Sequence, residues 1–117
     1  MIEAILWDVD GTLAETERDG HLVAFNAAFE QLGIPWRWDE HRYGELLRVT
    51  GGVERVLHDM QTQSWAPQGL DERIALARRI HKAKNRRYAD LVASGALPLR
   101  PGVRELFVDC AAAGVRM

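Results

Sequence analysis

The chain has 117 residues, of which 47% are hydrophobic and 27% charged, and its formal net charge at pH 7 is −2. This composition is typical of a globular protein of about one domain and excludes an intrinsically disordered chain. Lysine and arginine are scattered, and no apolar stretch approaches the ~18 to 20 residues of a membrane span, so we expect neither a nucleic-acid partner nor a membrane partner. Met1 leads into an apolar segment without a signal sequence, so we expect a cytoplasmic protein, with a monomer as the working assumption.

Apolar residues recur with different periods along the chain and predict a strand at each end with helices between them. A short apolar run over residues 2–7 stops at Asp8 and is typical of a buried parallel strand that leads into a loop. Helical spacing, with turn glycines and with Asp39 as an N-cap, predicts helices over residues 15–32, 39–47, 53–60, 71–94 and 103–113, followed by the start of a second strand at 115–117. The expected fold class is α/β, with a helical insert between two parts of one sheet.

The candidate catalytic residues follow the first predicted strand, in the segment Asp8-Val9-Asp10-Gly11-Thr12-Leu13. Open α/β sheets bind ligands at this position. Two carboxylates two residues apart can serve one phosphoryl centre, since one oxygen can attack phosphorus while the other carboxyl group, when protonated, assists the leaving group. A hard divalent cation compensates their like charges, and Mg²⁺ is commonly held by one or two carboxylates. Gly11 allows a sharp turn beside a phosphate, and Thr12 can offer it a hydroxyl and an amide.

A turn in which aspartate and glycine merely mark the end of a strand is the alternative interpretation of this segment. Four fixed residues at about 5 to 7% usage each match by chance in roughly one chain per thousand of this length. Because the segment also follows an apolar strand and precedes a loop, we favour the catalytic interpretation.

The segment is similar to the first signature of the haloacid dehalogenase superfamily, and residues 15–17, His21 and residues 24–26 resemble its β-phosphoglucomutase-like branch. The resemblance narrows to the CbbY-type phosphatases, which act on xylulose 1,5-bisphosphate. It spans nearly the whole chain and is carried by Tyr43-Gly44-Glu45-Leu46-Leu47, Thr50-Gly51-Gly52, Glu54-Arg55, His81-Lys82-Ala83-Lys84 and Leu99-Arg100-Pro101-Gly102.

This resemblance implies a Rossmann-like core, formed by residues 1–14 and 96–117 and only partly contained in the sequence, with a helical cap domain over residues 15–95. It also implies that Asp8 is the nucleophile and a Mg²⁺ ligand, and that Asp10 is the acid/base and gives its backbone carbonyl to the same metal. The family's later signatures are a Ser or Thr, a Lys and a further acidic metal ligand. We expect residues 1–117 to stop before the first of them and, taken alone, to be inactive.

Besides Gly11 and Thr12, the resemblance makes seven residues of the predicted cap candidates for substrate binding: Glu17, His21, Tyr43, Gly51, Gly52, Arg55 and Lys84. Lys84 takes the place of a lysine that meets the substrate's distal phosphate, although a lysine on an apolar stripe can also lie along the surface with its ammonium group in water. Val53 stands where these phosphatases usually have a lysine, a departure that bears on one contact to the substrate phosphate. Arg100 is interpreted as a structural residue of the return to the core.

The other cap candidates each have a structural interpretation as well. Gly51 and Gly52 can present amides to a phosphate or simply separate two helices. Arg55 can pair with a phosphate or lie on a solvated face. Glu17 and His21 are four residues apart, so they share one helix face and can either close over the site or form a surface pair.

These residues together predict a Mg²⁺-dependent phosphatase that hydrolyses a small phosphorylated sugar, such as xylulose 1,5-bisphosphate, through a phosphoaspartate. One alternative is a phosphosugar mutase of the β-phosphoglucomutase type, which an assay of free phosphate against isomerised sugar phosphate separates from a phosphatase. The other is a non-catalytic fragment or binding module, which an intact-mass measurement tests by showing whether the polypeptide continues beyond Met117.

Overall fold

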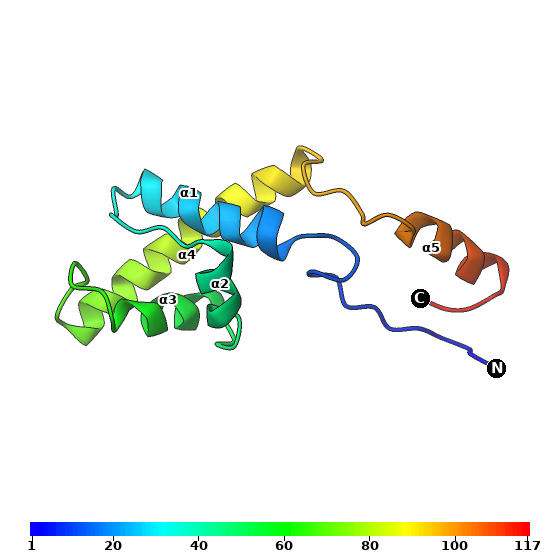
Figure 1. Ribbon diagram of the computed structural model, residues 1–117, viewed down its shortest axis with the longest axis horizontal. Helices are drawn as coiled ribbons and strands as arrows, with labels where there is room; N and C mark the ends of the chain where they lie inside the picture. The colour runs from blue at the N-terminus through cyan, green and yellow to red at the C-terminus, as the bar shows by residue number, and fades with distance from the viewer.

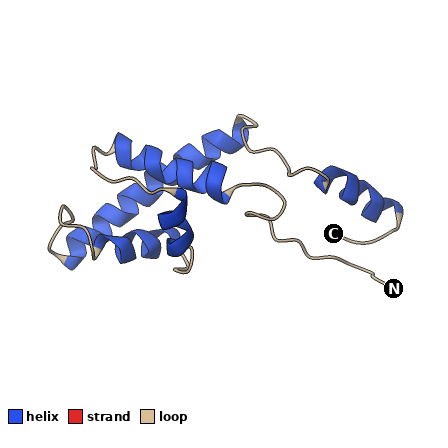
Figure 2. Ribbon diagram, viewed as in Figure 1, coloured by secondary structure: helices blue, strands red, loops and turns tan.

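The computed structural model describes residues 1–117, and every regular element in it is a helix (Figure 1, Figure 2). The elements are η1 (Glu17–Leu22), α1 (Val23–Gln31), α2 (Glu40–Leu46), α3 (Gly52–Met60), α4 (Leu70–Ala93) and α5 (Val103–Ala112). The molecule is elongated, 57 × 28 × 23 Å, with η1 and α1 to α4 gathered at one end and α5 beside both chain termini at the other (Figure 1). No helix combines the length and the apolar character needed to cross a membrane.

The strands expected at residues 2–7 and 115–117 do not form as strands. The two segments run side by side and in parallel, but they are joined by one isolated bridge between Ala4 and Arg116. The Ile5 amide donates to the Arg116 carbonyl (2.9 Å), and the Arg116 amide donates to the Glu3 carbonyl (3.1 Å). A ladder needs longer runs on both partners, and only three residues follow Gly114 in the sequence. The expected sheet is therefore represented by a single parallel bridge.

The helix starts follow the expected local signals, with differences of one or two residues and one difference in helix type. The Asp39 side chain accepts a hydrogen bond from the Arg42 amide (2.7 Å) and caps α2, as expected. Helix α4 begins at Leu70, one residue before Asp71. The first helix opens as a π-helix rather than an α-helix, and the His21 amide donates to the Thr16 carbonyl five residues earlier (2.6 Å). Single π-helical turns are rare and often occur at functional sites.

An aromatic core holds α1 to α4 together. Phe25 and Phe29 on α1 are fully buried, and both rings contact Trp38, with centroids 4.9 and 5.0 Å away. Ile80 of α4 is buried in the same cluster. Asn26 fixes the Trp38 backbone, because its side chain donates to the Trp38 carbonyl (2.8 Å) and accepts from the Trp38 amide (2.9 Å). The bundle thus has an apolar core of its own, separate from the segments at the chain ends.

A buried carboxylate links α3 to α2 and to the loop that precedes α2. Asp59 on α3 is only 1% exposed and accepts a hydrogen bond from the Trp38 indole nitrogen (2.7 Å). The Arg42 guanidinium of α2 also donates to it, through Nε (3.1 Å) and Nη2. Buried carboxylates are tolerated only when paired and hydrogen-bonded, and Asp59 meets both conditions.

We expect Asp59→Ala to destabilise the bundle by about 2 to 3 kcal/mol, because the indole N–H and the guanidinium both lose their acceptor. Chemical denaturation followed by tryptophan fluorescence measures this change in the free energy of unfolding. Asp71→Ala, at an exposed aspartate in the first turn of α4, is the matched control and should change it by less than about 0.5 kcal/mol. Equal effects of the two substitutions would contradict the role given to Asp59.

Candidate active site

The two candidate catalytic aspartates lie on a tight loop that follows the extended N-terminal segment. The Val9 carbonyl accepts from the amides of Thr12 (3.2 Å) and Leu13 (3.0 Å), so the chain reverses directly after Asp10. Gly11 has a φ of +72°, a conformation that favours glycine. This loop therefore requires the glycine of the sequence motif.

The Asp8 carboxylate is exposed and has one partner within the chain. The Thr12 hydroxyl donates to its Oδ2 (3.1 Å), and no donor of the chain contacts Oδ1. The Thr12 amide is engaged with the Val9 carbonyl, so both Thr12 groups that were expected to face a phosphate have partners in this structure. Asp8 thus keeps one carboxylate oxygen open to a substrate or a cation.

Asp10 differs from Asp8 because its carboxylate is held by the first helix. The Thr16 hydroxyl donates to Asp10 Oδ1 (2.6 Å), and His21 Nε2 lies 3.3 Å from the same oxygen. The Thr16 hydrogen bond is the main cause that lowers the pKa of Asp10 below its ordinary value. The aspartates therefore have distinct environments, one open and one fixed by hydrogen bonds.

Asp10, Glu17 and His21 converge on one point. One carboxylate oxygen from each acid and one imidazole nitrogen lie within 4.8 Å of one another, so the pair predicted to share a helix face also meets the loop that carries Asp8 and Asp10. The Tyr43 hydroxyl of α2 donates to Glu17 Oε2 (2.8 Å). Burial, followed by the Glu17 hydrogen bond, raises the pKa of Tyr43, so its hydroxyl remains a donor at neutral pH.

His21 is neutral at neutral pH, because burial lowers the pKa of its imidazole below the ordinary value. A carboxylate only accepts, so the contact with Asp10 places the proton on Nε2 and leaves Nδ1 as an acceptor. Nδ1 is buried and has no hydrogen-bond partner in the chain. The ring stacks on Tyr88 of α4, with centroids 4.1 Å apart and planes 12° from parallel.

Lys84 lies in the interior of the bundle rather than along its surface. It is only 7% exposed, and its ammonium nitrogen lies 5.2 Å from the ring centroids of both Phe25 and Tyr88. Its one hydrogen bond, to the Asn85 side chain, is long (3.4 Å). Burial and the charge of Arg55 lower the pKa of Lys84. A buried ammonium group with so little compensation is costly, which favours a binding role over the surface alternative.

The paired glycines and Arg55 have contacts that serve the fold. Gly51 has a φ of +95°, and the Glu54 carboxylate folds back over it. A Cβ at Gly52 would lie 2.5 Å from the His81 ring of α4, so a side chain at this position would displace that ring. Arg55 donates to the carbonyls of residues 46 (3.1 Å) and 49 (3.2 Å) at the end of α2. Binding of a phosphate by these three residues stays a prediction.

Three residues near the site were not singled out for function from the sequence. Thr16 binds Asp10, Tyr88 stacks on His21, and Arg100 donates to the Gly11 carbonyl (3.0 Å). Tyr88 lies four residues after Lys84, so helical spacing places both on one face and could have indicated it. No local signal indicates Arg100, because its partner is 89 positions away.

Residues 2–117 match the family model of the haloacid dehalogenase-like hydrolases. The chain belongs to this family. It is 48% identical, over its whole length, to Protein CbbY of Cereibacter sphaeroides, and the match covers 48% of that protein. A crystal structure of CbbY from Rhodobacter sphaeroides in complex with phosphate matches 99% of this chain with a TM-score of 0.80 and 48% identity, and the match covers 49% of that chain.

A mutant of the same bacterial CbbY, crystallised in complex with xylulose 1,5-bisphosphate, matches with 47% identity and a TM-score of 0.80, over 99% of this chain and 49% of the other. The chain spans about half the length of the curated relatives it matches. Family membership and the likeness to the CbbY structures agree with the resemblance drawn from the sequence. The strands expected at the chain ends remain one bridge in this structure.

Haloacid dehalogenase-like hydrolases generally use Mg²⁺, and the residues of the loop fit this ion. Mg²⁺ prefers oxygen ligands and is held by few protein groups. Asp8 offers a carboxylate oxygen without a protein donor, and no group of the chain donates to the Asp10 backbone carbonyl. At Asp10, Oδ1 is engaged with Thr16 and His21, so the ligands it can offer the ion are Oδ2 and the backbone carbonyl.

Proposed function

We propose that the protein to which this chain belongs is a Mg²⁺-dependent phosphatase that hydrolyses a small sugar phosphate through a phosphoaspartate on Asp8. The observation that carries this proposal is the contrast between the two aspartates in a loop of this family. Asp8 is exposed with an open oxygen, and Asp10 is fixed by Thr16 beside Glu17 and His21. One residue is thus suited to attack and the other to proton transfer.

In the proposed reaction, an Asp8 oxygen attacks phosphorus and forms a new P–O bond while the bond from phosphorus to the sugar oxygen breaks. Asp10 must be protonated for this step, and the negative charge of a bound phosphate would favour that form although the Thr16 hydrogen bond lowers its pKa in this structure. It then gives its proton to the leaving oxygen, so the sugar departs as an alcohol. Water then attacks the phosphoaspartate, Asp10 takes a proton from it, and inorganic phosphate leaves with Asp8 regenerated. When bound by Asp8 and the Asp10 carbonyl, Mg²⁺ would neutralise charge on the phosphate oxygens.

We also propose that residues 15–95 are a cap over a core to which residues 1–14 and 96–117 contribute. The bundle of η1 and α1 to α4 is joined to the chain ends by two connections (Figure 1). Its inner polar groups, from Glu17, His21, Tyr43 and Lys84, face the side of the loop that carries Asp10. Neutral donors and acceptors suit sugar hydroxyls, and an ammonium group suits a second phosphate.

Release of inorganic phosphate from xylulose 1,5-bisphosphate by the intact protein, with Mg²⁺ and then with excess EDTA, tests the proposed function. We expect phosphate release only with Mg²⁺. An isomerised sugar phosphate in place of free phosphate would identify a mutase. No turnover of any sugar phosphate would contradict the enzyme assignment and favour a binding module.

We predict that Lys84→Met reduces kcat/KM for the bisphosphate by about 10- to 100-fold, the value of a lost charge-assisted hydrogen bond. For the matching monophosphate, which has only the transferred phosphate, the reduction should stay below about threefold. Methionine keeps most of the buried volume, so packing against Phe25 and Tyr88 is preserved. The measurement is kcat/KM for both substrates with wild type and variant.

Lys82→Met is the matched control, because Lys82 is exposed on the same helix and has no side-chain partner in the chain. It should leave both kcat/KM values unchanged. Equal losses for the two substrates with Lys84→Met would mean that Lys84 serves packing and not the distal phosphate.

A further inference from the structure

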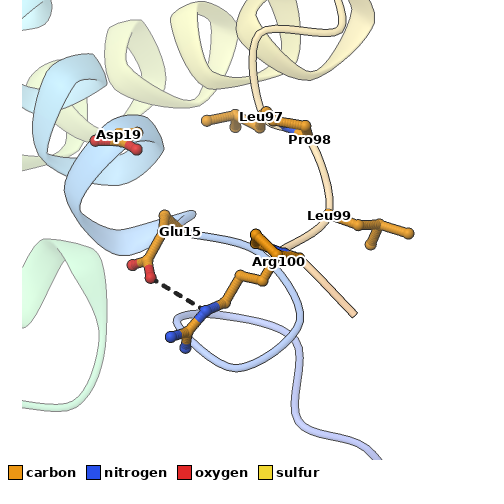
Figure 3. A pocket seen from close by; sticks show the side chains of 7 residues that line it. Glu15, Asp19, Leu97, Pro98, Leu99 and Arg100 are labelled. Atoms are coloured by element: carbon orange, nitrogen blue, oxygen red, sulfur yellow. Dashed lines mark ion pairs between the residues drawn. The ribbon is translucent and has the colours of Figure 1, made fainter. Parts of the chain in front are cut away.

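The two connections between the bundle and the chain ends meet beside the catalytic loop. Residues 11–16 lead from Asp10 into the first helix, and residues 96–102 lead from α4 to α5. Ala14 and Leu99 form an antiparallel bridge between them. A cavity of about 280 Å³ lies in this region, lined by residues of both connections and by Asp19 of η1: Glu15, Asp19, Leu97, Pro98, Leu99, Arg100 and Pro101 (Figure 3).

Arg100 makes three contacts to the first connection, each to a different residue. Its amide donates to the Leu13 carbonyl (2.8 Å), and its guanidinium Nη1 donates to the Gly11 carbonyl (3.0 Å). Its Nε lies 3.3 Å from Glu15 Oε1, and the two side chains point toward each other (Figure 3). A single side chain thus spans the loop from the residue after Asp10 to the entrance of the first helix.

The Arg100 contacts matter more for the position of the loop that carries Asp8 and Asp10 than for the stability of the fold. The Arg100 and Glu15 side chains are 47% and 40% exposed, and exposed ion pairs add little to the free energy of unfolding. Gly11 has a φ of +72°, so its peptide plane is the least restricted in the loop, and the bond to its carbonyl fixes that plane. The next residue, Thr12, donates from its hydroxyl to Asp8. The orientation of Gly11 therefore affects Asp10, its direct neighbour, and Asp8 through the Thr12 hydroxyl.

We propose that Arg100 is a positioning residue, which holds the catalytic loop in register by bridging the Gly11 carbonyl and the Glu15 carboxylate. The loop is then fixed from two sides, by Thr16 and His21 at Asp10 and by Arg100 at Gly11. Arginine suits this place because its planar guanidinium donates to the Gly11 carbonyl while its charge pairs with the Glu15 carboxylate, which a lysine ammonium on a flexible stem does less well. The catalytic part of this proposal rests on the proposed function.

Phosphate release by the intact protein is measured for wild type, Arg100→Met and Arg100→Lys. We expect Arg100→Met to lower kcat by about 10- to 100-fold, the effect of a small misplacement of the reacting groups, with KM changed less than about threefold. Arg100→Lys should fall between Arg100→Met and wild type. The melting temperature should move by less than about 2 °C in both variants.

Amide hydrogen exchange of residues 8–16 gives a second readout that needs no turnover. Arg100→Met should speed exchange in this segment by about tenfold and leave α1 to α4 unchanged. Arg104→Met is the matched control, because Arg104 is exposed at the start of α5 and its side chain has no partner in the chain. It should change neither kcat nor exchange. Glu15→Gln should lower kcat less than Arg100→Met does and add little to it in the double variant, because the two residues act through one bridge.

The outcomes separate this inference from the proposed function. If wild type releases phosphate but Arg100→Met keeps its kcat within twofold of wild type, the positioning role is wrong. It is also wrong if kcat falls only because the variant is less stable, which a matching fall in melting temperature would show. Wild-type kcat in Arg100→Lys would mean that the positive charge alone matters. It would overturn the bridge that Arg100 is proposed to form between the Gly11 carbonyl and the Glu15 carboxylate. If wild type releases no phosphate, the proposed function fails, and the exchange of residues 8–16 alone decides whether Arg100 holds the loop.

Discussion

Asp8→Asn should abolish Mg²⁺-dependent phosphate release while leaving the fold intact. An amide is a far weaker nucleophile than a carboxylate, and removal of an enzyme nucleophile typically costs roughly 10⁴-fold or more in kcat. The fold should survive because Asp8 is exposed and its one contact, with the Thr12 hydroxyl, can also be made by the amide oxygen of asparagine. The measurement is a single-turnover assay of phosphate release by the intact protein, with the melting temperature followed in parallel.

Asp109→Asn is the matched control for this substitution. Asp109 is an exposed aspartate on α5, and its side chain has no hydrogen-bond or ion-pair partner in the chain. It should keep wild-type kcat. Rapid acid quenching followed by peptide mass analysis should find a phosphoryl group on the peptide that carries residue 8 in wild type and none in Asp8→Asn. Near wild-type turnover in Asp8→Asn would exclude Asp8 as the nucleophile.

The helices could be predicted from the sequence because their signals are local. Asp39 caps α2 through a hydrogen bond three residues along the chain, and Gly33, Gly95 and Gly114 each have the positive φ of a residue that ends a helix. Apolar spacing predicted five helices, which agrees with the structure when the contiguous η1 and α1 are counted as one, and their bounds are correct within a few residues. The π-helical opening at Glu17–Leu22 could not be predicted, because apolar residues at 22, 25 and 29 fit an ordinary helix equally well.

The strands were wrong for a physical reason. Residues 2–7 have the apolar pattern of a buried parallel strand, but a strand exists only through its neighbours, and its one partner here is a three-residue segment after Gly114. The pattern therefore indicates a segment suited to burial between neighbouring strands, but with one bridge partner Leu6 is 98% exposed in this structure. The bridge between Ala4 and Arg116 is parallel, which agrees with the α/β class of the family.

Only the part of the candidate site that is formed by neighbouring residues in the sequence could be predicted. Asp8, Asp10 and Gly11 form such a motif, and family membership supports it. The partners that separate the two aspartates could not be read in this way. Thr16 reaches Asp10 because of the turn at Gly11, and Arg100 reaches Gly11 from 89 residues away. These contacts depend on the path of the chain rather than on any spacing in the sequence.

For Lys84 the sequence leaves two interpretations open, a surface lysine and a phosphate-binding lysine, and the structure bears on the choice between them. Its place on an apolar stripe is compatible with a surface side chain whose ammonium group reaches water. In the structure Lys84 is only 7% exposed, and its ammonium group lies between the rings of Phe25 and Tyr88. Placing a charged ammonium group there has a cost in desolvation. The surface alternative is therefore disfavoured, and binding of a distal phosphate stays a prediction for the substrate comparison described above.

Asp10→Asn should reduce kcat by about 10² to 10⁴-fold, the usual effect of losing a general acid/base, while KM changes only a few-fold. Asparagine can still accept from the Thr16 hydroxyl, so the loop and the neighbouring His21 should keep their places. The measurements are kcat and KM for xylulose 1,5-bisphosphate and the Mg²⁺ concentration that gives half-maximal activity. Asp109→Asn again serves as the control.

The Mg²⁺ dependence is the discriminating result for Asp10. Its carboxylate oxygen Oδ1 is engaged by Thr16 and His21, whereas its backbone carbonyl accepts from no group of the chain. If the carbonyl is the metal ligand, the substitution leaves that ligand in place, and the Mg²⁺ requirement should change by less than about threefold. Loss of Mg²⁺ affinity in the same proportion as kcat would instead make the Asp10 side chain a direct ligand, and its assignment to proton transfer would then be wrong.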